Sequence, residues 1–186
     1  MTAPTLSTPT LTGDYDVDPS HSRVGFAAKH AMVTTVRGGF KDFTAEAHLD
    51  EENVANSSVR VEIQTASIDT GNAQRDEHLR NGDFLEVEAH PTISFVSTKV
   101  EQTGDETYAV TGDLTIKGIS KPVTVNFEKT GAADDPWGSF RVGFEGKTVI
   151  NRKDWGVNWN VALEAGGILV SDKVTLEFDI ASVRRK

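Results

Sequence analysis

The sequence predicts an all-β protein built from at least eight antiparallel strands. Apolar and polar residues alternate with period two in at least eight segments, which is the pattern of strands with one buried face. Turn-forming residues separate neighbouring segments, as in Thr103–Glu106, Lys117–Pro122 and Ala133–Pro136. Short turns of this kind favour antiparallel neighbours over helical crossovers.

The expected elements follow in chain order. Residues 1–12 are rich in threonine, proline and serine and are predicted to form a flexible tail, with one folded domain over residues 13–183. The inward faces of the expected strands carry these residues: Val24, Phe26 and Ala28; Phe43, Ala45, Ala47 and Leu49; Val59, Val61 and Ile63; Ile93 and Phe95; Leu114 and Ile116; Val123, Val125 and Phe127; Phe140, Val142 and Phe144; Val174, Leu176, Phe178 and Ile180.

The last expected strand, Val174–Ile180, is long, regular and free of proline. As an open sheet edge it would favour aggregation, so closure into a barrel is the better prediction, although alternation alone also allows a sandwich. Ala28, Ala45 and Ala47 on the inward faces leave volume that the phenylalanines need not fill, which predicts a narrow apolar cavity. The alternative is that large residues face the alanines and pack the barrel solid.

A polar segment between Ser67 and Pro91 interrupts the strand pattern. Asp69 or Thr70 can cap a short helix there, and Gly82 lies where a left-handed C-terminal cap is expected. The helix has almost no apolar stripe, so other contacts must hold it in place. Three of its side chains are expected to brace the insertion against the barrel: Arg75, Asp76 and His78.

Composition excludes several function classes. There are 28 acidic and 19 basic residues, and the net charge of −9 is expected to repel phosphate backbones and anionic membrane surfaces. We therefore expect neither a nucleic-acid partner nor stable membrane insertion. The chain has no cysteine, which excludes disulfides and thiolate metal sites. The N-terminal residues show neither a basic stretch nor an apolar run, so a cytoplasmic location is expected.

The spacing of the five histidines does not support a metal site or a catalytic centre. They form neither a His-x-His pair nor an i, i+4 pair, and no nucleophile elbow occurs, so we expect no metal, no cofactor and no catalytic residue. Two alternatives stay open. One is an enzyme acting on a lipid with His21 or His78 as the base, and the other is a solid barrel that serves as a protein-interaction module.

A second polar cluster spans Asn151–Gly156. Arg152 could hold the head of a ligand through its fork-shaped guanidinium, with Trp155 and Trp159 placing flat apolar surface beside it. The alternative is that Arg152 pairs with Asp154 and closes the barrel end.

Eight motifs together carry a resemblance to a known family. They are Asp18–Phe26, Gly39-Phe40, Ser67–Thr70, Arg75–Leu79, Asp83-Phe84, His90–Phe95, Gly112–Gly118 and Asn151–Gly156. Each motif alone is weak, but in this order, from about residue 13 to residue 180, the chain resembles the YceI-like family.

The resemblance implies an eight-stranded, lipocalin-like antiparallel barrel with a short helical insertion. It also implies a non-catalytic protein whose elongated cavity carries or sequesters a polyisoprenoid, such as a prenyl quinone or prenyl pyrophosphate, or another long-chain amphiphile. A homodimer is compatible with the sequence. The predicted ligand-binding residues are Phe26, Phe40, Phe43, Ala45, Ala47, Phe95, Phe144, Arg152, Trp155 and Trp159.

Overall fold

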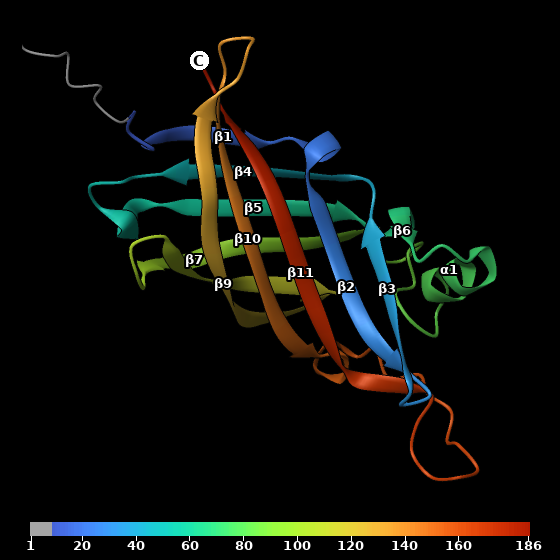
Figure 1. Cartoon of the computed structure of the whole chain (residues 1–186). Helices are drawn as coiled ribbons and strands as arrows, with labels where there is room; N and C mark the ends of the chain where they lie inside the picture. The colour runs from blue at the N-terminus through green and yellow to red at the C-terminus, as the bar shows by residue number, and fades with distance from the viewer. Residues whose placement is uncertain (1–8) are drawn as a thin grey trace, which may run out of the picture.

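Eleven strand segments form one antiparallel sheet that closes on itself (Figure 1). The computed structural model describes residues 9–186. The segments are β1 (Gly13–Val17), β2 (Arg23–His30), β3 (Thr34–Phe40), β4 (Phe43–Leu49), β5 (Ser58–Gln64), β6 (Ile68–Asp69), β7 (Thr92–Gln102), β8 (Thr107–Ile116), β9 (Ile119–Asp134), β10 (Phe140–Asn151) and β11 (Val170–Arg184). Among these residues no helix is long and apolar enough to cross a membrane.

The eleven segments amount to eight strands, because three strands are interrupted. The 3-10 turn η1 (Pro19–His21) separates β1 from β2, and both segments pair with β11. A bend at residues 41–42 separates β3 from β4, and η3 (Thr65–Ser67) separates β5 from β6. The strand order β1-β4-β5-β7-β8-β9-β10-β11 returns to β1, which confirms the predicted eight-stranded antiparallel barrel.

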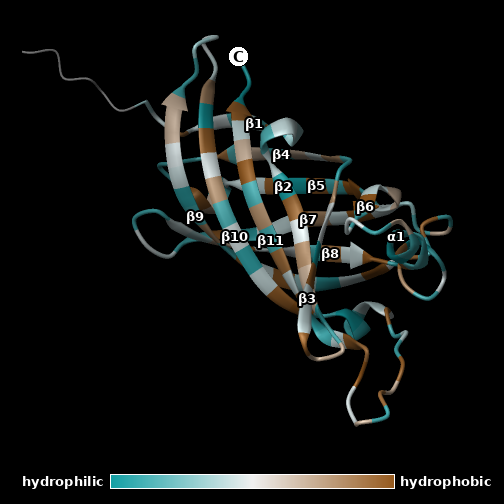
Figure 2. Cartoon of the chain, turned by 45° about the vertical axis from the view of Figure 1, so that its right-hand side comes forward, coloured by the Kyte–Doolittle hydropathy of each residue, from teal (hydrophilic) through white to brown (hydrophobic). Residues whose placement is uncertain are grey.

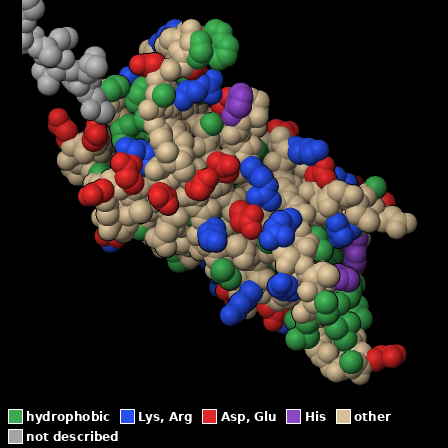
Figure 3. Space-filling model, in the orientation of Figure 1, with side chains coloured by type: hydrophobic (Ala, Val, Ile, Leu, Met, Phe, Trp, Pro, Cys, Tyr) green, Lys and Arg blue, Asp and Glu red, His purple; other side chains and the backbone are tan. Residues whose placement is uncertain are grey.

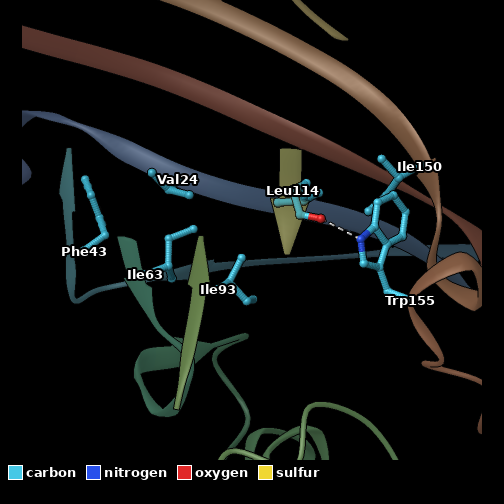
Figure 4. Packing of buried hydrophobic residues seen from close by; sticks show 7 residues of the cluster. All are labelled: Val24, Phe43, Ile63, Ile93, Leu114, Ile150 and Trp155. Atoms are coloured by element: carbon cyan, nitrogen blue, oxygen red, sulfur yellow. Dashed lines mark hydrogen bonds between the residues drawn. The ribbon is translucent and has the colours of Figure 1, made fainter. Parts of the chain in front are cut away.

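Two apolar clusters fill parts of the barrel interior. The larger one contains Val24, Phe43, Ile63, Ile93, Leu114, Ile150 and Trp155, which point toward one another from opposite walls (Figure 4). The second one contains Leu11, Tyr15, Phe140 and Val142. The alternation of hydrophobic and hydrophilic residues that predicted these faces is visible along the strands in Figure 2.

The N-terminal residues that the structure describes pack on the barrel before Gly13. Leu11 is buried, its backbone N–H donates to Glu51, and its carbonyl accepts the Tyr15 hydroxyl at 2.7 Å. Thr10 also donates to Glu51 and accepts from Arg184, so contacts with the barrel begin three residues ahead of the predicted boundary at residue 13. Residues 1–8 of the predicted tail lie outside the described residues, so for them the tail stays a prediction.

The helix α1 (Ala73–Arg80) lies at one end of the barrel, between β6 and β7 (Figure 1). Asn72 caps it, with the side-chain oxygen accepting from the Arg75 N–H at 3.0 Å, so the predicted cap at Asp69 or Thr70 is wrong. Asn81, and not Gly82, ends the helix, and Gly82 is not among the glycines with positive φ. Asparagine at the N-cap satisfies an otherwise unpaired backbone donor.

Candidate functional site

A cavity of about 520 Å³ runs inside the barrel. Cavities of about 300–1,000 Å³ are typical of small-molecule sites. Eight of the ten predicted site residues line it: Phe26, Phe40, Phe43, Ala45, Ala47, Phe95, Phe144 and Arg152. The two ends are lined by different loops, the β4–β5 and β7–β8 loops at one end and the helical insertion with the start of the loop after β10 at the other.

Small residues on β4 account for part of this open volume. Ala45 pairs with Val61 and Ala47 with Val59, and all four line the cavity. A large side chain at either alanine position would project into the space that is now empty. The structure thus supports the predicted narrow cavity and contradicts the alternative of a solidly packed barrel.

The helical insertion closes one end of the cavity with apolar side chains. Phe84 is buried there, and Leu79 and Leu85 also line the wall. The His78 ring contacts Phe84 and Trp159 edge-to-face, with ring centroids 5.0 Å and 4.6 Å away, and Phe84 and Trp159 also contact each other at 5.3 Å. These three rings join the insertion to the loop that precedes β11. The alternation pattern missed the lining residues of the insertion because it applies only to strands.

Polar contacts brace the insertion against β6, as the sequence predicted for Arg75 and Asp76. Asp76 is buried and its carboxylate accepts the Thr70 backbone N–H at 2.9 Å. The Arg75 Nε–H donates to the Thr70 hydroxyl at 2.7 Å, and Arg80 donates to the Ile68 carbonyl at 2.9 Å. His78 takes part through its ring contacts. These hydrogen bonds hold the helix in place, because it has no apolar stripe that could pack against the barrel.

Arg152 belongs to η4 (Arg152–Trp155) and lies at the same end of the cavity as the insertion. Only 6 % of the residue is exposed, and its guanidinium donates to three carbonyls, those of Val157 at 2.7 Å, Ser171 at 2.9 Å and Val170 at 3.3 Å. Burial lowers the pKa of Arg152, and the charge of Asp172 opposes that shift. The guanidinium thus ties β11 to the segment after β10.

The carboxylate nearest to Arg152 is Asp172 and not Asp154, so the predicted Arg152–Asp154 pair is wrong. The distance between the guanidinium and the carboxylate is 3.9 Å, at the long limit of an ion pair. The same Asp172 oxygen lies 3.3 Å from the Lys153 ammonium. Asp154 is exposed, whereas Arg152 is buried and lines the cavity. The two side chains therefore leave η4 in different directions.

Trp155 and Trp159 do not line the cavity, which corrects two of the predicted site residues. Trp155 is buried in the larger core cluster, where its indole N–H donates to the Leu114 carbonyl at 2.9 Å (Figure 4). Trp159 is half-buried and packs against His78 and Phe84, but it is not among the residues that line the cavity. The prediction assumed that residues close to Arg152 in the sequence share its side of the cavity. It was wrong because η4 and the following loop turn neighbouring side chains in different directions.

Charged residues line the opposite end of the cavity. Four of them are acidic, namely Asp50, Glu51, Asp105 and Glu106, and the sequence analysis did not single them out. The ammonium of Lys129 lies 3.0 Å from the Glu106 carboxylate. The backbone N–H of Leu11 donates to Glu51 and, with the Thr10 hydroxyl, lowers the pKa of that carboxyl. We call these four acidic residues the acidic rim.

Neither histidine proposed as a base faces the cavity. His21 pairs with Asp18 at 2.7 Å on the surface, and His78 pairs with Asp83 at 2.9 Å. In residues 9–186 no three acidic, histidine or cysteine side chains are grouped to hold a metal ion. Apart from Glu46 on β4, the charged residues of the lining lie at the two ends of the cavity, and apolar side chains cover most of the length between them.

An eight-stranded antiparallel barrel around an apolar cavity defines the chain as a small β-barrel of the ligand-binding type. The family model for the YceI-like domain matches residues 15–182. The chain therefore belongs to the YceI-like family, which confirms the resemblance.

Two solved structures and one curated relative show how close the likeness is. A UPF0312 protein of Pseudomonas aeruginosa is 41 % identical over 153 residues, covering 81 % of this chain and 80 % of the relative. BcnA of Burkholderia cenocepacia has a TM-score of 0.78 at 28 % identity over 89 % of this chain and 98 % of its own. A polyisoprenoid binding domain from Saccharophagus degradans, at 12 % identity, has a TM-score of 0.66 over 92 % of this chain and 98 % of its own, and shares the fold.

Proposed function

We propose that the protein binds one long, slender apolar lipid of the polyisoprenoid class in the barrel cavity and carries or sequesters it. The observation that carries the proposal is the cavity itself, which is apolar along its length and reaches from the acidic rim to Arg152. Burial of apolar surface contributes about 25 cal/mol per Å², so a long chain can bind tightly with few polar contacts. The family and the polyisoprenoid binding domain that shares the fold support this class of ligand.

We further propose that the bound lipid has a neutral head group, such as a quinone, rather than a pyrophosphate. The two cations on the cavity wall are both engaged, Arg152 with three carbonyls and Lys129 with Glu106. The four carboxylates of the acidic rim outnumber them and would repel an anion. A neutral carbonyl or hydroxyl meets no such repulsion.

The wall also favours a binding protein over an enzyme. A base must come within about 2.6–3.2 Å of the proton that it takes, directly or through one water molecule. His21 and His78 are absent from the cavity wall, so the alternative of a lipid-modifying enzyme lacks its proposed base. The cytoplasmic location and the homodimer stay predictions, which cell fractionation and analytical ultracentrifugation will test.

The test uses mass spectrometry of an organic extract from the purified protein, followed by titration with a prenol and a prenyl pyrophosphate of equal length. We expect a co-purified isoprenoid and tighter binding of the prenol. Ala47→Trp should block uptake by filling the cavity, whereas Thr44→Trp, on the exposed outer side of the same strand, should not. Unchanged uptake by a folded Ala47→Trp protein would disprove binding in the cavity.

A further inference from the structure

Two loops project from the end of the barrel that Arg152 closes. One is the β2–β3 turn at residues 31–33, and the other is the long loop of residues 156–169 that extends from the lower end of the barrel in Figure 1. The Ala31 N–H donates to the Leu169 carbonyl at 2.7 Å, which joins the two loops. We call residues 31–33 and 161–169 together the loop tip.

The loop tip is apolar and exposed. Met32 is 64 % exposed, Val33 78 % and Val161 47 %, and Glu164 is the one charged residue in the loop of residues 156–169. Figure 2 colours long stretches of this loop as hydrophobic, and Figure 3 shows hydrophobic side chains gathered at this end of the molecule. Contiguous exposed apolar surface of this kind marks an interaction site.

The barrel wall next to the loop tip carries exposed cations. We call them the basic collar: Lys29, Arg37, Lys147, Lys153 and Lys173. Lys29 and Lys173 are adjacent in sequence to the cavity-lining Ala28 and Val174, so they point outward. Among the described residues only Lys153 of the collar forms an ion pair, with Asp172. Lys and Arg side chains lie along the strands that lead to the tip in Figure 3.

The two ends of the barrel differ in their balance of charge. The five cations of the basic collar outnumber the carboxylates beside them, which are Asp154, Glu164, Asp172 and Glu177, the last lying opposite Lys147 in the β10–β11 register. The basic collar adjoins the loop tip, whereas the acidic rim lies on the β4–β5 and β7–β8 loops at the other end of the cavity. This difference occurs in a chain whose net charge is −9, so the collar is a local feature and does not reflect the composition. A negatively charged surface would attract the collar and repel the rim, which orients the molecule.

We propose that the loop tip and the basic collar dock the protein on the surface of an anionic lipid bilayer. Met32, Val33 and Val161 would enter the boundary between head groups and acyl chains, and the collar would face the lipid phosphates. A second copy of this chain fits less well, because a two-fold contact through this surface would place the two collars against each other.

Docking in this way would also serve lipid exchange, a consequence that rests on the proposed function. Val157, near the start of the loop of residues 156–169, and Val170, directly after it, both line the cavity. A docked tip therefore places this end of the cavity against the bilayer. An apolar chain could then move between bilayer and barrel with little contact with water.

The absence of cysteine allows a direct test with the full chain. Val33→Cys carries a polarity-sensitive fluorophore at the tip, and Trp137→Cys carries it at an equally exposed apolar position in the β9–β10 turn. Each protein is mixed with phosphatidylcholine vesicles, with and without phosphatidylglycerol. We expect a blue shift only for the label at residue 33, only with phosphatidylglycerol, and weaker at high salt.

Substitutions test the loop tip and the basic collar separately. The double substitution Met32→Ser with Val33→Ser should weaken vesicle binding roughly tenfold or more, because it removes the free energy gained when two apolar side chains are buried in the bilayer. Lys29→Ala with Arg37→Ala should weaken it roughly 30-fold, since each cation near such a surface contributes about fivefold. Trp137→Ser and Lys99→Ala serve as controls that should bind as the original protein does. Circular dichroism checks that every variant is folded.

Several outcomes would overturn the proposal. They are no response at residue 33, an equal response at residue 137, or a response to protein concentration without vesicles, which would instead indicate contact between copies. Ala47→Trp should still dock while it fails to take up lipid, so docking and cavity binding fail separately. Lipid uptake with no vesicle binding would overturn docking alone.

Discussion

The indole N–H of Trp155 donates to the backbone carbonyl of Leu114 at 2.9 Å, and both residues are buried in one core cluster. Leu114 belongs to β8, whereas Trp155 comes from the 3-10 turn after β10. The bond therefore closes the end of the barrel across two elements that are far apart in the sequence. A buried indole N–H needs such a partner, and here it fixes the ring in the core and away from the cavity.

Trp155→Phe should lower the free energy of unfolding by about 1 kcal/mol, because the ring stays buried while one hydrogen bond is lost. Trp155→Ala should lower it by about 3–5 kcal/mol through the cavity that it leaves. Urea denaturation measures both. Lipid affinity of Trp155→Phe should stay unchanged, and a large loss of affinity with normal stability would place the ring at the ligand.

Asp76→Ala should reduce the melting temperature more than it reduces lipid binding. The buried carboxylate accepts the Thr70 backbone N–H and hydroxyl, and its removal leaves these donors unpaired. Calorimetry with and without a prenol compares the two effects. Glu77→Ala, on an exposed position of the same helix, serves as the control. Binding lost at full stability would instead make Asp76 part of a head-group site.

Asp18 should make stability depend on pH. Hydrogen bonds from Ser20, His21 and Arg141 hold the pKa of its carboxyl well below the ordinary value of 3.8. Because the pKa is lowered in the folded state, this stabilisation is present above about pH 4 and is lost as the pH falls toward the folded-state pKa. The difference in unfolding free energy between the original protein and Asp18→Asn should therefore shrink between pH 7 and pH 2. A difference that is constant over this range would contradict the assignment.

Local patterns predicted the barrel well because each strand has one buried face. The alternation at Ala45 and Ala47 indicated both the strand and the space inside it, and both side chains line the cavity. The strand interruptions were missed. The break between β1 and β2 forms where the Asp18 side chain caps Pro19–His21, and a cap of this kind leaves no mark on the apolar pattern.

The end of the cavity was predicted less well because its contacts join distant parts of the chain. Arg152 bonds carbonyls at Val170 and Ser171, and the sequence alone suggested only its neighbour Asp154 as a partner. Side-chain direction after a 3-10 turn follows no period-two rule, so the tryptophans near Arg152 were placed at the cavity. Long-range backbone acceptors have no sequence signature.

The role of Arg152 leads to the last prediction. A charge-assisted hydrogen bond contributes about 1.5–3 kcal/mol, and Arg152 makes three such bonds to carbonyls in a buried setting. Arg152→Met keeps much of the side-chain volume, so its main effect should be the loss of these bonds, with a fall of at least about 3 kcal/mol in unfolding free energy. The ratio of prenol to prenyl pyrophosphate affinity should stay the same, because the guanidinium is engaged by the protein. Lys153→Met, at an exposed neighbouring cation, should change neither quantity by much. If Arg152→Met instead weakens the pyrophosphate far more than the prenol, Arg152 holds the head group and the neutral-head proposal fails.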